Sequence, residues 1–147
     1  MIPRHRLPLA LFLLALCPVL AQQTRITTTA PLSGYTLTFF GDSGYPRALV
    51  EGATADLNDR DRIALTGVKL TLYTDDADQQ IESILTAPDA VLEPETELVS
   101  GEGMVRLQRE DLTVTGEAWT YDHAAKRIQI HRRAHIVFRA PLPDLLK

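Results

Sequence analysis

Short runs in which apolar and polar residues alternate fill most of this chain, and polar turns separate them. Tyr35 to Phe40 is one such run, and Leu112 to Thr115 is another. Alternation with a period of two is the pattern of a strand that buries one face. The runs recur at intervals of roughly 8 to 12 residues, the spacing typical of an all-β sandwich or barrel. We therefore expect one all-β domain over residues 35–140, built from about ten short antiparallel strands.

Residues 81–87 are the segment whose pattern is least decisive. Their apolar positions fit either a short helical stripe or a strand. A strand is favoured because the segment is short, contains β-branched residues and meets Pro88. The following stretch, residues 89–103, offers only a brief apolar run and then acidic residues around Pro94, which indicates a loop or a sheet edge.

Two glycines mark places where the alternation changes parity. Apolar residues move from odd to even positions across Gly67, and a one-residue change beside a glycine predicts a β-bulge. Trp119 and Tyr121 have the parity opposite to that of Val114. They either cover an outer face or follow a bulge at Gly116.

One sequence pattern occurs twice in the chain. Residues 52–73 and 116–138 each contain a glycine, a short strand, a polar turn and a strand led by arginine, Arg62 to Leu65 in the first copy and Arg127 to Ile130 in the second. Residues 87–107 supply a weaker echo. A unit of strand, turn and strand cannot bury its apolar face alone, whereas stacked units can. The repeat thus predicts an elongated sheet.

The first residues have the layout of a secretory signal. Arg4 and Arg6 precede an apolar run over residues 7–20, and Ala21 offers a small residue for cleavage. A membrane-spanning helix needs roughly 20 apolar residues, so residues 1–21 are predicted to be a signal peptide. An uncleaved inner-membrane anchor over residues 7–20 is the alternative. A Thr-rich lead over residues 22–34 and a tail over residues 141–147 flank the β domain.

Cleavage would change both the cysteine count and the net charge. The single cysteine, Cys17, would leave with the signal, so no disulfide is expected. Removing Arg4 and Arg6 from the 15 basic residues leaves 13 against 19 acidic residues, a net charge of −6 with neutral histidine. This sign argues against nucleic acid as a partner.

The later part of the chain resembles a known family. Residues 112–122, LTVTGEAWTYD, are followed by Arg127 to Ile130 and then by Ala134 to Phe138. This succession resembles the repeats of the periplasmic lipopolysaccharide-export proteins of the LptC and LptA (OstA-like) type. Residues 44–57, followed by the Ala-Pro-Asp-Ala step at residues 87–90, are more similar to LptC. The cleavable N-terminus departs from LptC and keeps an LptA-like role open.

The resemblance implies a twisted open β-jellyroll (OstA-like) in the periplasm that carries lipopolysaccharide, or a similar amphipathic lipid, in an apolar groove. It implies strand edges that join other Lpt-type proteins, and an inner-membrane lipopolysaccharide ABC transporter as the energy source. No cofactor is required. The candidate groove residues are the apolar positions Phe40, Leu70, Leu72, Val105, Leu107, Leu112, Val114, Ile128, Ile130, Ile136 and Phe138. Candidate contacts to lipid phosphate are Arg127, Arg132 and Arg133, and the candidate partner edge is Ala134, Ile136 and Phe138.

Other functional classes are less well supported by the residues. His131 and His135 are spaced for one strand face, but neighbouring arginines oppose metal binding, so no metal site is predicted and solvent-facing histidines, including His123, are expected. Acidic runs near residues 56–61 and 75–78 lack the features of a calcium loop and are interpreted as hairpin turns. No nucleophile elbow or phosphate loop occurs, so the chain is not expected to be an enzyme. The competing hypothesis is a closed structural β-sandwich adaptor that links β-proteins through its edges without binding lipid.

Overall fold

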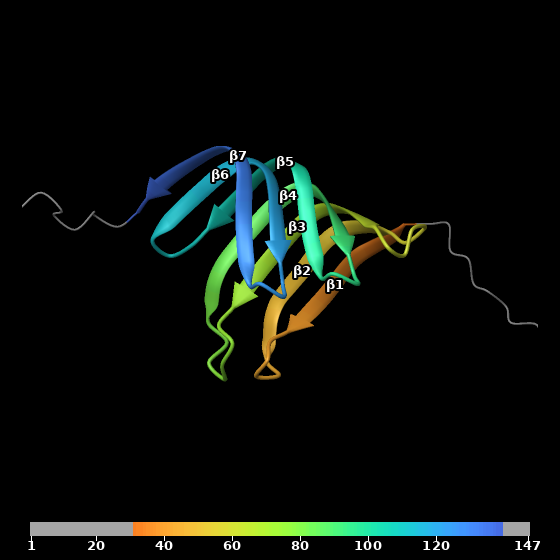
Figure 1. The fold of residues 1–147 in the computed structure, drawn as a ribbon, viewed down its shortest axis with the longest axis horizontal. Helices are drawn as coiled ribbons and strands as arrows, with labels where there is room; N and C mark the ends of the chain where they lie inside the picture. Colours follow the sequence, from red (N-terminus) through yellow and green to blue (C-terminus); the bar gives the residue numbers. More distant parts are fainter. Residues whose placement is uncertain (1–30, 140–147) are drawn as a thin grey trace, which may run out of the picture.

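A single antiparallel sheet of seven strands in chain order forms the protein (Figure 1). The structure, a computed structural model, describes residues 31–139. The strands are β1 (Leu32–Phe40), β2 (Pro46–Asp56), β3 (Ile63–Tyr73), β4 (Ile81–Glu93), β5 (Leu98–Gln108), β6 (Leu112–Asp122) and β7 (Arg127–Phe138). The signal or anchor expected at residues 1–21, most of the lead at residues 22–34 and the tail at residues 141–147 lie outside the described residues. Within residues 31–139, no helix is long and apolar enough to cross a membrane.

The all-β prediction is confirmed, but the strands are fewer and longer than the pattern suggested. The seven strands have 9 to 13 residues each, against about ten short strands expected. Several pairs of short runs are the two halves of one strand, because hydrogen bonding continues where the apolar parity changes. β4 unites residues 81–87, confirmed as strand, with residues 90–92. β5 begins at Leu98, in a stretch whose pattern had indicated a loop.

The parity change at Gly67 comes from a bend, not from the β-bulge predicted there. Leu65 and Val68 are both buried, so the inward-facing parity does change at Gly67. The pairing of β3 with β4 nevertheless keeps one register across the glycine, since Thr66 pairs with Asp89 and Val68 with Ala87. Gly67 has a φ of +60°, a left-handed conformation that glycine adopts without steric cost. The positions of β3 that point to the core therefore change from odd to even at Gly67 without an inserted residue.

β6 does contain a true irregularity beside its glycine. The β6–β7 register shifts between Thr115 and Glu117, and Ala118 has a φ of +52°. Trp119 and Tyr121 are each 1% exposed, so they lie in the core despite the parity opposite to that of the preceding half-strand. The pairing is thus irregular beside Gly116, with the extra residue on β7 between Arg132 and His135, and the outer-face reading is wrong.

The bends fold the sheet over itself, so that both halves of the strands contribute to one core. Buried side chains such as Val50, Leu70 and Leu85 precede or follow the bends in the first strands, while Val99 and Trp119 come from the other half. The two copies of the sequence repeat form the β2–β3 and β6–β7 hairpins. In Figure 1 the sheet is seen to curl, and β7 bends sharply between its two parts.

His123 connects the β6–β7 turn to the end of β1. Its Nε2 donates a hydrogen bond to the Phe40 carbonyl at 3.0 Å, and its Nδ1 lies 2.8 Å from the Tyr121 hydroxyl. Because a carbonyl only accepts, Nε2 carries a hydrogen. This residue, His123, is 6% exposed and its ring lies 5.1 Å from that of Phe39. The expectation of a solvent-facing histidine is wrong here, since the curl of the sheet covers the turn.

Candidate functional site

Apolar residues form two cross-strand rows on the inner face of the sheet, near the end of β5, the start of β6 and the end of β7. One row is Leu107, Val114 and Ile136, in which Val114 pairs with both of the others. The second row pairs Leu112 with Phe138. Residues directly opposite each other in an antiparallel pair share a face, and residues two apart on a strand share it too. All five side chains therefore point to the same side as the core.

Other residues cover this part of the inner face less than they cover the part formed by β1–β4. Ile136 is 51% exposed and Phe138 is 54% exposed, while Leu107 and Val114 are partly buried. Leu85, on the same face further along the sheet, is 0% exposed. The core thus fills the inner face toward β1–β4 and leaves it open toward the end of β7. In Figure 1 the last part of β7, in dark blue, lies beside β6 at one end of the sheet.

Two isoleucines from the first half of β7 face these rows. Ile128 and Ile130 pair with the buried Tyr121 and Trp119, and both pack against the core. A Cβ atom on Gly116 would collide with the Ile130 methyl group, so Ile130 lies directly over the glycine. The open apolar strip is the name used below for the following set: Leu107, Leu112, Val114, Ile128, Ile130, Ile136 and Phe138.

The remaining candidate groove residues lie elsewhere. Leu70, Leu72 and Val105 are 0%, 8% and 2% exposed, so they belong to the packed core beside the strip. Phe40 follows a register shift at the end of β1 and is 60% exposed, apart from the strip. Trp119 is a large core residue whose side the alternation pattern left open, and it lies inside because the inward-facing parity of β6 changes between Gly116 and Trp119, where Ala118 has a positive φ.

Three basic residues near the C-terminal end, Lys126, Arg132 and Arg133, contact separate acidic partners. Arg132 Nη2 contacts Glu102 Oε2 at 3.0 Å, and Arg133 Nη1 contacts Glu117 Oε1 at 2.9 Å. Arg127 is exposed, and Lys126 Nζ contacts Asp42 Oδ2 at 2.7 Å. Contacts from Arg127, Arg132 and Arg133 to lipid phosphate stay a prediction, although these side chains do not converge on one point.

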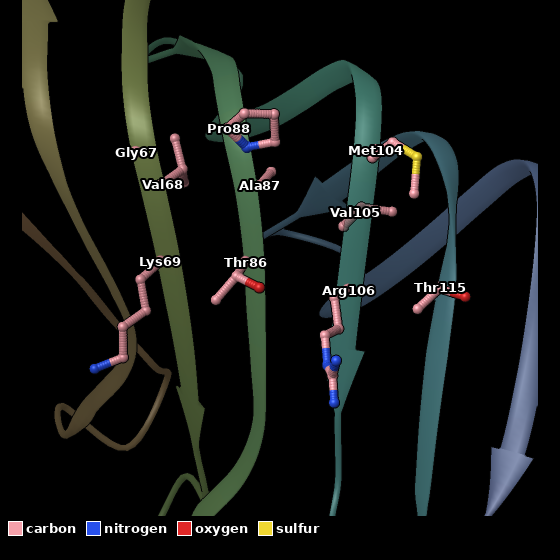
Figure 2. A pocket seen from close by; sticks show the side chains of 10 residues that line it. All are labelled: Gly67, Val68, Lys69, Thr86, Ala87, Pro88, Met104, Val105, Arg106 and Thr115. Atoms are coloured by element: carbon pink, nitrogen blue, oxygen red, sulfur yellow. The ribbon is translucent and has the colours of Figure 1, made fainter.

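One pocket lies away from the strip, at the bend of β3, β4 and β5. It has a volume of about 580 Å³. Figure 2 shows Lys69, Thr86 and Arg106 along its wall, with Pro88 and Met104 nearer the bend. These first three side chains alternate with core residues along their strands, so the pocket opens on the outer face.

The acidic runs form turns, as their composition indicated. Asp56 Oδ1 accepts a hydrogen bond from the Asn58 amide at 2.9 Å, and Asp76 Oδ1 accepts one from the Asp78 amide at 3.0 Å. Side chains that bond two residues ahead stabilise tight turns. Within residues 31–139, no three histidine, cysteine, aspartate or glutamate side chains are placed to hold a metal ion. His131 Nε2 instead lies 3.2 Å from Thr120 Oγ1.

A bent antiparallel sheet with an apolar inner face that is open at one end is an open β-jellyroll, and the expected fold class is confirmed. The family model described as lipopolysaccharide-assembly, LptC-related, matches residues 11–138. The chain belongs to this family of lipopolysaccharide-assembly proteins. The resemblance to LptC is thereby confirmed. A search of curated proteins gives no match.

Proposed function

We propose that this protein binds the acyl chains of lipopolysaccharide in the open apolar strip and passes the lipid onward in export to the outer membrane. The observation that supports the proposal most strongly is the exposure of Ile136 and Phe138 on the inner face of an LptC-related jellyroll. A contiguous set of exposed apolar side chains on the core-facing side of a sheet is typical of a binding surface.

The strip suits exchange of an alkyl chain better than permanent storage. Each methylene buried against apolar side chains contributes about 0.8 kcal/mol. A strip that is open along one side lets a chain leave without unfolding the protein, so similar strips on neighbouring proteins can pass it on. Binding and release of this kind need no covalent chemistry and no cofactor. The energy would come from the ATP-driven inner-membrane transporter that the family resemblance implies.

The location and the partners follow from the same proposal. Transfer toward the outer membrane places the jellyroll in the periplasm, after cleavage of residues 1–21 or anchored by residues 7–20. Within residues 31–139, β7 pairs with β6 alone, so Ala134, Ile136 and Phe138 lie on an edge strand. An edge strand with unpaired backbone groups is suited to pairing with the sheet of another Lpt-type protein.

Substitutions at two neighbouring residues distinguish a loss of lipid binding from a loss of stability. Ile136 and Val137 are 51% and 53% exposed, but Val114 pairs with Ile136 while Val137 pairs with Thr113 on the outer face. Ile136→Asp is expected to weaken binding of an acylated lipid by roughly tenfold or more, because it places a carboxylate in the path of the chain. Val137→Asp should leave binding unchanged. The measurement is titration of the purified chain with a fluorescent acyl lipid, and equal affinities for both variants would argue for the closed adaptor.

A further inference from the structure

A second pocket continues the open apolar strip toward the β5–β6 turn. It has a volume of about 270 Å³. Leu107 and Ile128 of the strip form part of its wall together with Leu72. The other wall residues are polar or charged: Arg47, Glu82, Ser83, Arg109 and Lys126. The pocket is thus apolar where it meets the strip and mainly cationic elsewhere.

The three cations differ in how firmly acidic groups hold them. Arg47 Nη1 contacts Glu82 Oε2 at 2.5 Å, and the Arg47 side chain is only 14% exposed. Lys126 Nζ contacts Asp42 Oδ2 at 2.7 Å, a charge-assisted contact of ordinary length. Both cations are therefore neutralised by close carboxylates, although they still contribute positive potential to the pocket.

Arg109 is the cation that is available to a ligand. Among residues 31–139, its only ion pair joins Nε to Asp111 Oδ1 at 3.6 Å, which is too long for a good hydrogen bond. Its side chain is 55% exposed. The Arg109 amide donates to the Leu112 carbonyl at 2.9 Å, and this short turn fixes the backbone beside the strip. The guanidinium group thus has a fixed base and free donors.

The pocket and the strip are joined through residues that the sheet itself aligns. Leu107, in the pocket, pairs with Val114, and Val114 pairs with Ile136. An alkyl chain that lies along this row leads directly from the open end of β7 to the cationic pocket. Its polar end would then lie beside Arg109.

We propose that this pocket binds the phosphate-bearing head group of the lipid whose chains occupy the strip, with Arg109 as its main contact. This inference rests on the function proposed above and names the ligand chemistry of the same site. The planar guanidinium fork matches two phosphate oxygens, and Arg47 and Lys126 add positive potential. The head group is thereby assigned to Arg109, in place of the contacts from Arg127, Arg132 and Arg133 that the sequence suggested.

The test compares two lipids that differ only in phosphate. The probes are an acylated disaccharide lipid with its phosphate groups and the same lipid without them, titrated against the full chain. The phosphorylated form should bind roughly tenfold tighter or more, since hydrogen bonds between charged groups are the stronger class. Arg109→Gln should remove most of this preference and leave binding of the phosphate-free lipid unchanged. Circular dichroism checks that the variant is folded.

Arg132→Gln is the matched control. The Arg132 side chain is 58% exposed, close to the 55% of Arg109, but its partner is Glu102. This control should keep the phosphate preference. Loss of the preference in Arg132→Gln, with none in Arg109→Gln, would overturn the assignment and support the sequence-based expectation instead.

The remaining outcomes separate this inference from the proposed function. Equal, measurable affinity of the unchanged protein for both lipids would overturn the head-group site and leave lipid binding in place. No binding of either lipid would overturn both. Binding of inorganic phosphate alone, as tight as that of the lipid and abolished by Arg109→Gln, would make the pocket a free-anion site and overturn the head-group assignment.

Discussion

Two buried tyrosines show how much a single hydroxyl partner matters in this core. The Tyr121 hydroxyl is bonded to His123, whereas the buried Tyr35 hydroxyl has no hydrogen-bond partner among residues 31–139. A satisfied buried hydroxyl contributes about 1 kcal/mol, and an unsatisfied one costs about 1 to 3 kcal/mol. Tyr121→Phe should therefore lower the free energy of unfolding by about 1 kcal/mol. Tyr35→Phe should leave it unchanged or raise it, and urea denaturation measures both.

The result that would contradict this account is an equal loss of stability in the two variants. Such a result would mean that the Tyr35 hydroxyl is paired in solution as well as that of Tyr121. Both substitutions remove one oxygen from a buried ring, so each is the volume control for the other.

The same tyrosines predict how stability depends on alkaline pH. Burial raises the pKa of Tyr35 and that of Tyr121 to about 12, from an ordinary value of 10.0. The neutral hydroxyl is thus favoured in the folded chain, and its contribution is fully present below pH 10 and is lost as the pH rises toward 12. The midpoint of urea unfolding should fall over this interval, and less steeply in Tyr35→Phe. A midpoint that is flat to pH 12 would contradict the burial of both hydroxyls.

Residue-scale features were the hardest to predict from sequence. His123 follows the tyrosine-aspartate step of a repeat, where the composition indicates an exposed turn. Its burial depends on the end of β1, 83 residues away in the chain, which the curl of the sheet brings to it. No local pattern carries that information. For the same reason the acidic partners of Arg132 and Arg133 could not be foreseen.

At the scale of the strands, the tight packing at Gly116 predicts a large effect of a small substitution. A Cβ atom there would collide with Ile130 and lie 2.9 Å from the Arg132 carbonyl oxygen. Gly116→Ala is therefore expected to lower the free energy of unfolding by about 1 to 3 kcal/mol, as overpacking does. Gly103→Ala is the control, because the nearest atom to its Cβ would be Pro88 Cγ at 3.8 Å. Thermal and urea unfolding should distinguish them, and equal stabilities would show that β6 and β7 separate easily.

Strand identity was predictable where alternation was clear, and strand continuity was not. Period two placed the first half of β6 and the end of β5 correctly because each keeps one parity over several residues. The two halves of β3 looked like separate strands, since a bend and a turn produce the same break in parity. The left-handed conformation of Gly67 changes which positions of β3 point to the core. Only the register with β4 shows that the strand pairing continues across the glycine.

At the scale of the whole molecule, the distribution of exposure separates a packed core from an open end. Val50, Leu70, Leu85 and Val99 are 0% exposed, whereas the inward-facing Ile136 and Phe138 are about half exposed. From the sequence, Leu70 falls in one apolar candidate set with Ile136 and Phe138, and residue type alone could not divide that set. The division depends on contacts between strands that are far apart in the sequence, which residue type does not encode.

The most direct test of the account is photo-crosslinking in living cells from Val114, Ile136 and Val137, one position at a time. Val114 and Ile136 lie in the open apolar strip, and Val137 is as exposed as Ile136 but faces outward. The account predicts lipopolysaccharide adducts from Val114 and Ile136 and none from Val137. Absence of lipid at both strip positions, with protein adducts from residues 134–138 instead, would contradict it and make this protein an adaptor that links β-sheets without carrying lipid.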